Sequence, residues 1–125
     1  EKYGYHCEKT LNLVMPGLDG LKKMRKLMET LRTQPPKEIG GTAVLRLTDY
    51  LPGTVLDVKS GAAAESRLRG SNVLYFELED GTDFIVRPSG TEPKIKVYIM
   101  VKGQCADDCG EKISVYEKYA KTLEG

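Results

Sequence analysis

The segment Arg87–Pro93, with the sequence RPSGTEP, concentrates groups that can bind an anion. An arginine presents a planar fork that can donate to two oxygens of one phosphate at the same time. The hydroxyls of Ser89 and Thr91 would add donors, and Gly90 between them lets consecutive backbone N–H groups approach one anion closely. The segment therefore predicts a phosphate site at a tight reversal of the chain.

The same composition is also typical of an ordinary turn, because Pro, Ser, Gly and Thr all favour reversals. Glu92 places a negative charge beside the expected anion, whereas Lys94 and Lys96 add positive potential nearby. Lys96 is the weaker candidate ligand, since its side chain can point away from the loop. The residues alone leave both interpretations open, a phosphate site and a plain turn.

The strand that leads into this segment is expected to form a β-hairpin with the strand before it. Apolar runs at residues 73–78 and 83–87 flank an Asp-Gly pair at 80–81. Asp-Gly between two such runs favours a two-residue type I′ turn. A turn of that length would pair Phe76 with Ile85.

The remaining segments complete an α+β pattern in which two helices and the sheet share one core. Residues 94–102 alternate between apolar and polar side chains, which predicts an antiparallel strand with one face on that core. Apolar residues at helical spacing predict a helix from Asp19 to about Thr33 and another from about 107. We expect strands at 10–15 and 42–47, and a long surface loop over 50–72 with one helical turn near 62–66.

These elements predict a single two-layer α+β domain spanning residues 1–125, with helices on one face of an antiparallel sheet. In the first helix, Leu21, Met24, Met28 and Leu31 form the expected apolar stripe. The basic residues of that helix, Arg32 among them, lie off the stripe and are expected either to face solvent or to dock another domain.

Charge and composition exclude several classes of partner. The chain has 125 residues and a net charge of +1, so no general attraction to nucleic acid or to an anionic membrane is expected. No apolar run approaches the ~20 residues that a membrane helix needs. The chain begins with Glu rather than Met, which suggests a piece of a longer protein or a processed product.

The cysteines favour reduced, structural thiols and a cytoplasmic location. There are three, Cys7, Cys105 and Cys109, and none forms a C-x-x-C pair. Cys105 and Cys109 are four apart and would share a face of a helix. With one histidine, His6, a zinc site would need a carboxylate or a partner chain, so no metal site is expected.

A longer stretch around the candidate loop, Arg87–Tyr98 with the sequence RPSGTEPKIKVY, resembles the phosphate-binding loop of the α-D-phosphohexomutases, the phosphoglucomutase/phosphomannomutase family. The Lys-Ile-Lys ending is more similar to the phosphoglucomutase and phosphopentomutase branch than to the phosphoglucosamine branch. The likeness to the family's last domain covers nearly the whole chain, through the segments Gly17–Arg32, Pro35–Gly41, Ser71–Leu74 and Asp80-Gly81.

The resemblance implies a domain with a fold like that of the TATA-binding protein, acting in a four-domain enzyme. In that family one domain carries a phosphorylated serine, a second holds Mg²⁺ and a third contacts the sugar hydroxyls. The fourth binds the phosphate that is not being transferred. Carried over to this chain, Arg87, Ser89, Gly90 and Thr91 would hold that phosphate, with Lys96 as a weaker candidate.

The parent protein implied by the resemblance is an isomerase. It would interconvert sugar 1- and 6-phosphates, or pentose 1- and 5-phosphates, through a bisphosphate intermediate. The serine, metal and sugar loops of the family are not found in this sequence, so we expect the chain alone to be inactive and to have no catalytic residue, cofactor or metal ion of its own. The expected partners are a phosphosugar and the other three domains, with no nucleic acid and no membrane.

Two other functions remain as alternatives. A stand-alone small-ligand or regulatory module would explain the missing catalytic loops without a longer protein. A nucleic-acid binder is suggested only by the fold analogy and by the basic residues of the first helix. The near-neutral charge and the lack of aromatic residues placed for base stacking argue against it.

Overall fold

The computed structural model describes residues 5–14, 19–51, 53–58, 60–65, 70–88, 94–103 and 105–122. Within these ranges the chain forms eight strands and two helices. In chain order the elements are β1 (Tyr5–Val14), α1 (Gly20–Thr33), β2 (Glu38–Ile39), β3 (Thr42–Asp49), β4 (Thr54–Asp57), β5 (Ala63–Glu65), β6 (Leu74–Leu78), β7 (Asp83–Pro88), β8 (Lys94–Gly103) and α2 (Ala106–Thr122).

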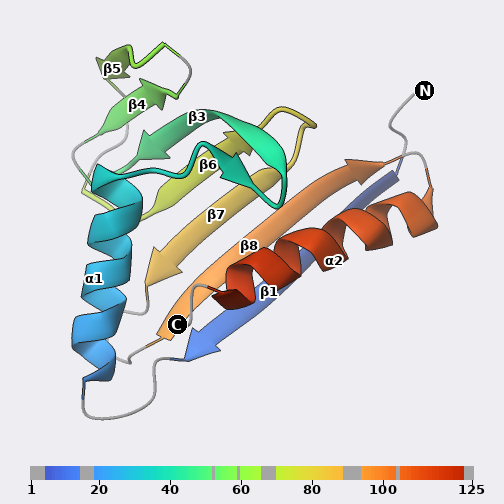
Figure 1. Cartoon of the computed structure of the whole chain (residues 1–125), viewed down its shortest axis with the longest axis horizontal. Coiled ribbons are helices and arrows are strands. Elements are labelled where there is room, and N and C mark those ends of the chain that lie inside the picture. The colour runs from blue at the N-terminus through green and yellow to red at the C-terminus, as the bar shows by residue number, and fades with distance from the viewer. Residues whose placement is uncertain are drawn as a thin grey trace.

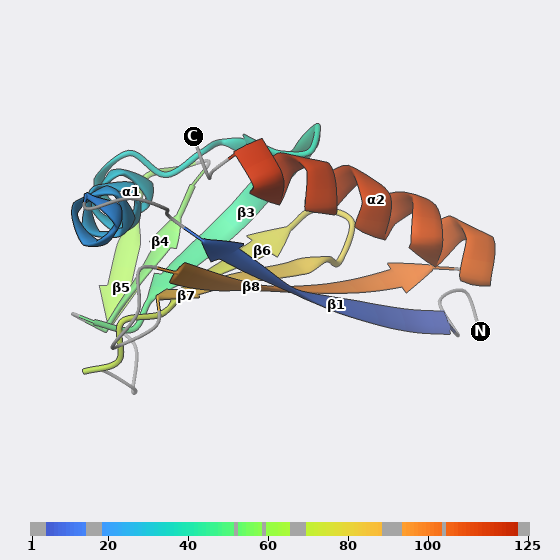
Figure 2. The same cartoon turned by 90° about the horizontal axis from the view of Figure 1, so that it is seen from below.

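The strands form an antiparallel sheet with the order β1-β8-β7-β6-β3-β4-β5, and the short β2 pairs with β3 (Figure 1). Both helices lie on one face of the sheet, and none of the described residues forms a helix on the opposite face (Figure 2). The two-layer α+β architecture predicted from the sequence is therefore confirmed. Neither of the two helices is long and apolar enough to cross a membrane, as far as the structure describes the chain.

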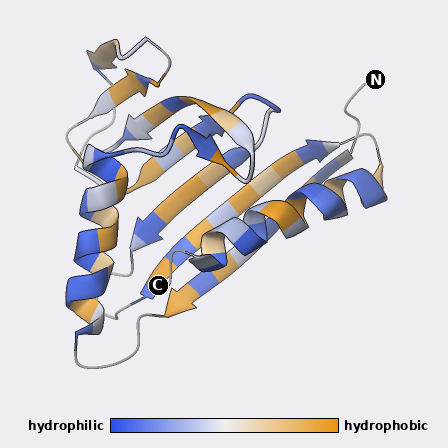
Figure 3. Cartoon of the chain, viewed as in Figure 1, coloured by the Kyte–Doolittle hydropathy of each residue, from blue (hydrophilic) through white to orange (hydrophobic). Residues whose placement is uncertain are grey.

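The core lies between the helices and one face of the central strands. Strand β8 shows the expected alternation, since its odd-numbered residues from Ile95 to Val101 are buried and its even-numbered residues are not. Hydrophobic and more hydrophilic positions alternate along this strand (Figure 3). Alternate residues of β6 and β7 face the same way, and Phe76 contacts Phe84 edge to face across the two strands. Continuous burial on one face only is what fixes the register of these strands.

Each helix contributes one apolar stripe to this core. Helix α1 buries Met24, Met28 and Leu31 as predicted, whereas Leu21 in its first turn is exposed. Asp19 precedes this helix at the expected cap position, but its side chain makes no capping hydrogen bond. Helix α2, predicted from about residue 107, buries Cys109, Tyr116 and Ala120.

The loop predicted over residues 50–72 is wrong, because β4 and β5 form a hairpin there and extend the sheet beyond β3. The reversal between the two strands is closed locally. The carboxylate of Asp57 accepts from the backbone N–H of Ser60 at 3.1 Å, and Gly61 adopts a positive φ of 78°. The described part of this segment contains no helical turn; residues 66–69, which the expected turn also touched, lie outside the described ranges.

The hairpin between β6 and β7 forms at the predicted place but with a different turn. The backbone N–H of Leu78 donates to the carbonyl of Thr82 at 2.9 Å, which makes the turn longer than two residues. Gly81 has a φ of 87° but Asp80 has no positive φ, so the turn is not type I′. As a result Phe76 pairs with Phe84, and the predicted pairing of Phe76 with Ile85 is wrong.

Candidate anion-binding site

The two predicted cations that the structure describes lie side by side on the open face of the sheet. Arg87 near the end of β7 pairs directly with Lys96 of β8. Their neighbours Val86 and Val97 are fully buried on the helical side, so Arg87 and Lys96 point to the other face. Arg87 is exposed and Lys96 is half-buried.

This pairing brings two positive charges close together. Directly opposed residues of an antiparallel pair have Cβ atoms about 4.5–5.5 Å apart, and like charges at that spacing destabilise the sheet. An anion bound between or beside the two groups would offset the repulsion. The pairing of these two side chains is therefore compatible with an anion at this end of β7.

The other three predicted ligands, Ser89, Gly90 and Thr91, lie outside the described residues. They follow Arg87 and Pro88 directly, so they belong to the connection between β7 and β8. Their assignment as phosphate ligands stays a prediction from the sequence.

A cavity of about 340 Å³ adjoins the exposed arginine. Its volume is near the lower limit for small-molecule sites. Its lining comes from two parts of the chain, the end of β7 and the segment that leads into β6. The lining residues are Ser71, Asn72, Val73, Arg87 and Pro88.

The 71–73 side of this cavity is tied firmly to the rest of the fold. The backbone N–H of Tyr50 donates to the carbonyl of Val73 at 3.0 Å, and that of Ser71 donates to the carbonyl of Tyr50 at 3.3 Å. The side-chain oxygen of Asn72 accepts from the guanidinium of Arg32 at 2.5 Å. This wall is therefore held by the connection after β3 and by the last turn of α1.

Arg32 is in turn held by a buried carboxylate. Its Nε donates to Oδ2 of Asp49 at 2.5 Å, and Oδ1 of the same carboxylate accepts from the backbone N–H of Leu51 at 3.1 Å. Asp49 is only 6% exposed. The expectation that Arg32 faces solvent or docks another domain is therefore wrong, because its guanidinium is used inside this domain.

Sequence reasoning missed this network because its members are far apart along the chain. Arg32 and Asp49 are 17 residues apart, and Arg32 and Asn72 are 40 apart. A helical periodicity shows only that Arg32 lies off the apolar stripe, and it cannot show which group receives the guanidinium. The only sequence signal that pointed to Asn72 was the segment Ser71–Leu74, one of the segments that resemble the family's last domain.

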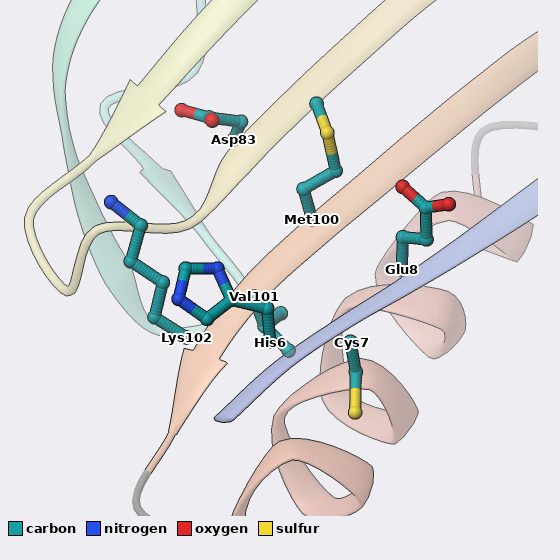
Figure 4. A pocket seen from close by; sticks show the side chains of 7 residues that line it. All are labelled: His6, Cys7, Glu8, Asp83, Met100, Val101 and Lys102. Carbon is teal, nitrogen blue, oxygen red and sulfur yellow. The ribbon is translucent and has the colours of Figure 1, made fainter. Parts of the chain in front are cut away.

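A second cavity, of about 330 Å³, lies at the other end of β7 (Figure 4). Asp83 lines it, four residues before Arg87 and thus about 13 Å away at roughly 3.3 Å per strand residue. Glu8 also lines it and adds a second carboxylate, while His6 and Lys102 contribute the basic groups. The two carboxylates make this cavity a poorer anion site than the one beside Arg87.

The cysteines do not form the helical pair expected from their spacing. Cys105 lies before the first residue of α2 and is exposed, whereas Cys109 is buried within the helix. None of the three cysteines, all of which lie in the described ranges, forms a disulfide. Across the described ranges, no group of three or more His, Cys, Asp and Glu side chains is arranged to hold a metal ion.

Comparison with known proteins places this chain in a family. Residues 11–105 match the family described as phosphoglucomutase/phosphomannomutase, C-terminal domain. Phosphoglucomutases from Staphylococcus aureus strains MSSA476 and USA300 are 37% and 36% identical to this chain over 112 residues. Each alignment covers 89% of this chain and 20% of the relative.

Among solved structures, the open form of pp63/parafusin, a phosphoglucomutase from Paramecium, aligns with 96% of this chain and 20% of that one, at 16% identity and a TM-score of 0.45. The chain thus spans about a fifth of the length of the curated relatives it matches. Because the family match covers most of its residues, this chain belongs to the phosphoglucomutase/phosphomannomutase C-terminal domain family.

Proposed function

We propose that this domain binds the phosphate of a phosphosugar that is not being transferred, with Arg87 as the principal ligand. The observation that carries the proposal is the position of Arg87, which is exposed, opposite Lys96, and on the wall of a cavity. A guanidinium is suited to this task because it can donate to two phosphate oxygens in one plane. Lys96 would contribute positive potential beside it.

Ser89, Gly90 and Thr91 would complete the site from the connection that follows Arg87. Two hydroxyls and closely spaced backbone N–H groups are the donors that a phosphate dianion requires. Together with the guanidinium they would surround one end of the substrate. The family membership of the chain supports this assignment, since the segment they occupy lies inside the matched range.

The parent protein in this proposal is a cytoplasmic mutase that interconverts sugar 1- and 6-phosphates, or pentose 1- and 5-phosphates, through a bisphosphate. Its Mg²⁺, its phosphorylated serine and its sugar-contacting residues would be supplied by three other domains. This domain would contribute positioning and electrostatic stabilisation, which supply much of the catalysis in phosphoryl transfer. By itself it would bind a phosphosugar without converting it.

The experiment is a titration of the labelled chain with glucose 6-phosphate, followed by NMR. Hydrogen bonds to charged groups contribute roughly 1.5–3 kcal/mol, so Arg87→Ala should weaken binding about 10- to 150-fold. Arg46→Ala is the matched control, because Arg46 is exposed on the same sheet face and pairs with Glu77 instead. Equal affinities of wild type and Arg87→Ala would refute the proposal.

A further inference from the structure

The side-chain amide of Asn72 is held in one orientation by its bond to Arg32. Nη2 of Arg32 lies 2.5 Å from Oδ1 of Asn72. A guanidinium has only donors, so the oxygen of the amide, and not its nitrogen, must face Arg32. The NH₂ group is thereby turned away from Arg32, and within the described part of the chain it donates to no other group.

Arg32 can impose this orientation because it is itself fixed. Its Nε is bound to the buried carboxylate of Asp49, and a different nitrogen of the same planar group reaches Asn72. The guanidinium side chain is 23% exposed and that of Asp49 is 9% exposed. Because the guanidinium of Arg32 is planar, mostly buried and bonded to Asp49, it leaves little freedom for the amide of Asn72.

Asn72 lines the same cavity as Arg87. We propose that Asn72 is an additional ligand of the anion held by Arg87, and that Arg32, anchored by Asp49, is the residue that positions it. This inference rests on the proposed function, and it adds a donor that comes from outside the β7–β8 connection. A phosphate would then be held between two segments that are distant in the sequence.

The chemical class of the ligand follows from the donors. A neutral NH₂ group supplies hydrogen bonds to phosphate oxygens without adding to the repulsion between Arg87 and Lys96. It would recognise the phosphate group itself, so inorganic phosphate is a sufficient probe. The sugar portion of a phosphosugar is not needed for this contact.

The test measures the dissociation constant of the chain for inorganic phosphate by NMR. Asn72→Ala should weaken binding about tenfold, which corresponds to about 1.4 kcal/mol. Asn72→Asp should weaken phosphate binding more than Asn72→Ala does. The aspartate keeps an oxygen that can accept from Arg32, but it replaces the NH₂ donor with a negatively charged oxygen that repels the phosphate. A merely structural role of Asn72 would leave the affinity of Asn72→Ala for phosphate at the wild-type value, because this variant removes the donor without adding a charge to the cavity.

The positioning role of Arg32 has its own readout. Phosphate should shift the side-chain NH₂ signals of Asn72 in the wild type and leave them unmoved in Arg32→Met. In the Asn72→Ala background, Arg32→Met should cause no further loss of affinity. Arg25→Met, an exposed arginine of the same helix, is the matched control and should bind phosphate like the wild type.

The outcomes separate this inference from the proposed function. If Arg87→Ala weakens phosphate binding while Asn72→Ala binds like the wild type, the role of Asn72 is overturned and the proposed function stands. If the wild type binds no phosphate, or Arg87→Ala binds it equally well, both fail together. Should Arg32→Met not fold, the two Asn72 variants still decide the question.

Discussion

The turn between β2 and β3 offers a sharp test of how α2 packs on the sheet. Gly40 and Gly41 form this turn with φ angles of 59° and 85°, a conformation that suits glycine. A Cβ atom added at Gly40 would lie 2.9 Å from Cγ1 of Val115 and 3.0 Å from Cδ1 of Tyr116. A Cβ added at Gly41 would meet nothing within 4 Å.

The two glycines therefore separate backbone strain from steric overlap. Forcing a residue with a Cβ into the left-handed region costs roughly 1–2 kcal/mol, and this cost applies to both positions. Overpacking a well-filled site adds roughly 1–3 kcal/mol, and it applies only to Gly40. Gly40→Ala should thus reduce the free energy of unfolding by about 2–5 kcal/mol, and Gly41→Ala by about 1–2 kcal/mol.

Urea denaturation at 25 °C, followed by circular dichroism, measures both variants. With a slope of about 1–3 kcal/mol per molar urea, Gly40→Ala should lower the midpoint by roughly 0.7–5 M, and Gly41→Ala should lower it by clearly less at the same slope. The difference between the variants is the informative quantity, because the backbone cost is shared. Equal midpoints for the two variants would refute the packing of α2 against this turn.

Two further predictions concern Tyr116, whose hydroxyl donates to Oδ2 of Asp80 at 2.6 Å and lies 2.9 Å from the hydroxyl of Thr42. Tyr116→Phe leaves both partners without this bond, so urea denaturation should show a loss of about 1–3 kcal/mol; an unchanged midpoint would contradict the bond. Burial, and then the hydrogen bond to Asp80, raise the pKa of Tyr116 above its ordinary value of about 10. The folded state therefore holds the proton of the Tyr116 hydroxyl more strongly than the unfolded state does. The contribution of this hydroxyl to the free energy of unfolding is complete below about pH 10 and is lost as the pH rises further. Melting temperatures between pH 8 and 12 should fall less steeply in Tyr116→Phe than in the wild type, and parallel curves would contradict this.

The elements with one continuously buried face could be predicted from the sequence. In β8 every second residue from Ile95 to Val101 is buried by the helices, so the pattern of period two is complete. Helix α1 is recognised for the same reason, because Met24, Met28 and Leu31 all enter the core. Burial on one face imposes a periodicity that a local pattern can reveal.

The β4–β5 hairpin could not be predicted in this way. All three residues of β5 are exposed, and its two alanines carry no β-strand signal of their own. The strand exists because β4 offers it a backbone edge, and β4 in turn pairs with β3. Backbone pairing of this kind leaves little trace in hydrophobic periodicity.

The candidate site shows the same division between local and distant information. Arg87 and Lys96 could be proposed as phosphate ligands from the sequence, because both belong to the short stretch that contains the recognisable turn. Their direct pairing across β7 and β8 follows from the register of the sheet. Asn72 could not be assigned a role, because its orientation depends on Arg32, which is 40 residues away.

The most direct test of the central claim is the location of phosphate on the domain. Backbone amides of the ¹⁵N-labelled chain should be followed by NMR while inorganic phosphate is raised to tens of millimolar. A dissociation constant near 1 mM corresponds to about 4 kcal/mol of binding free energy. Saturable shifts at Ser89, Gly90 and Thr91 that disappear in Arg87→Ala are the result expected here. Shifts confined to other surfaces, or equally large in Arg87→Ala, would contradict the claim that this end of the sheet binds phosphate.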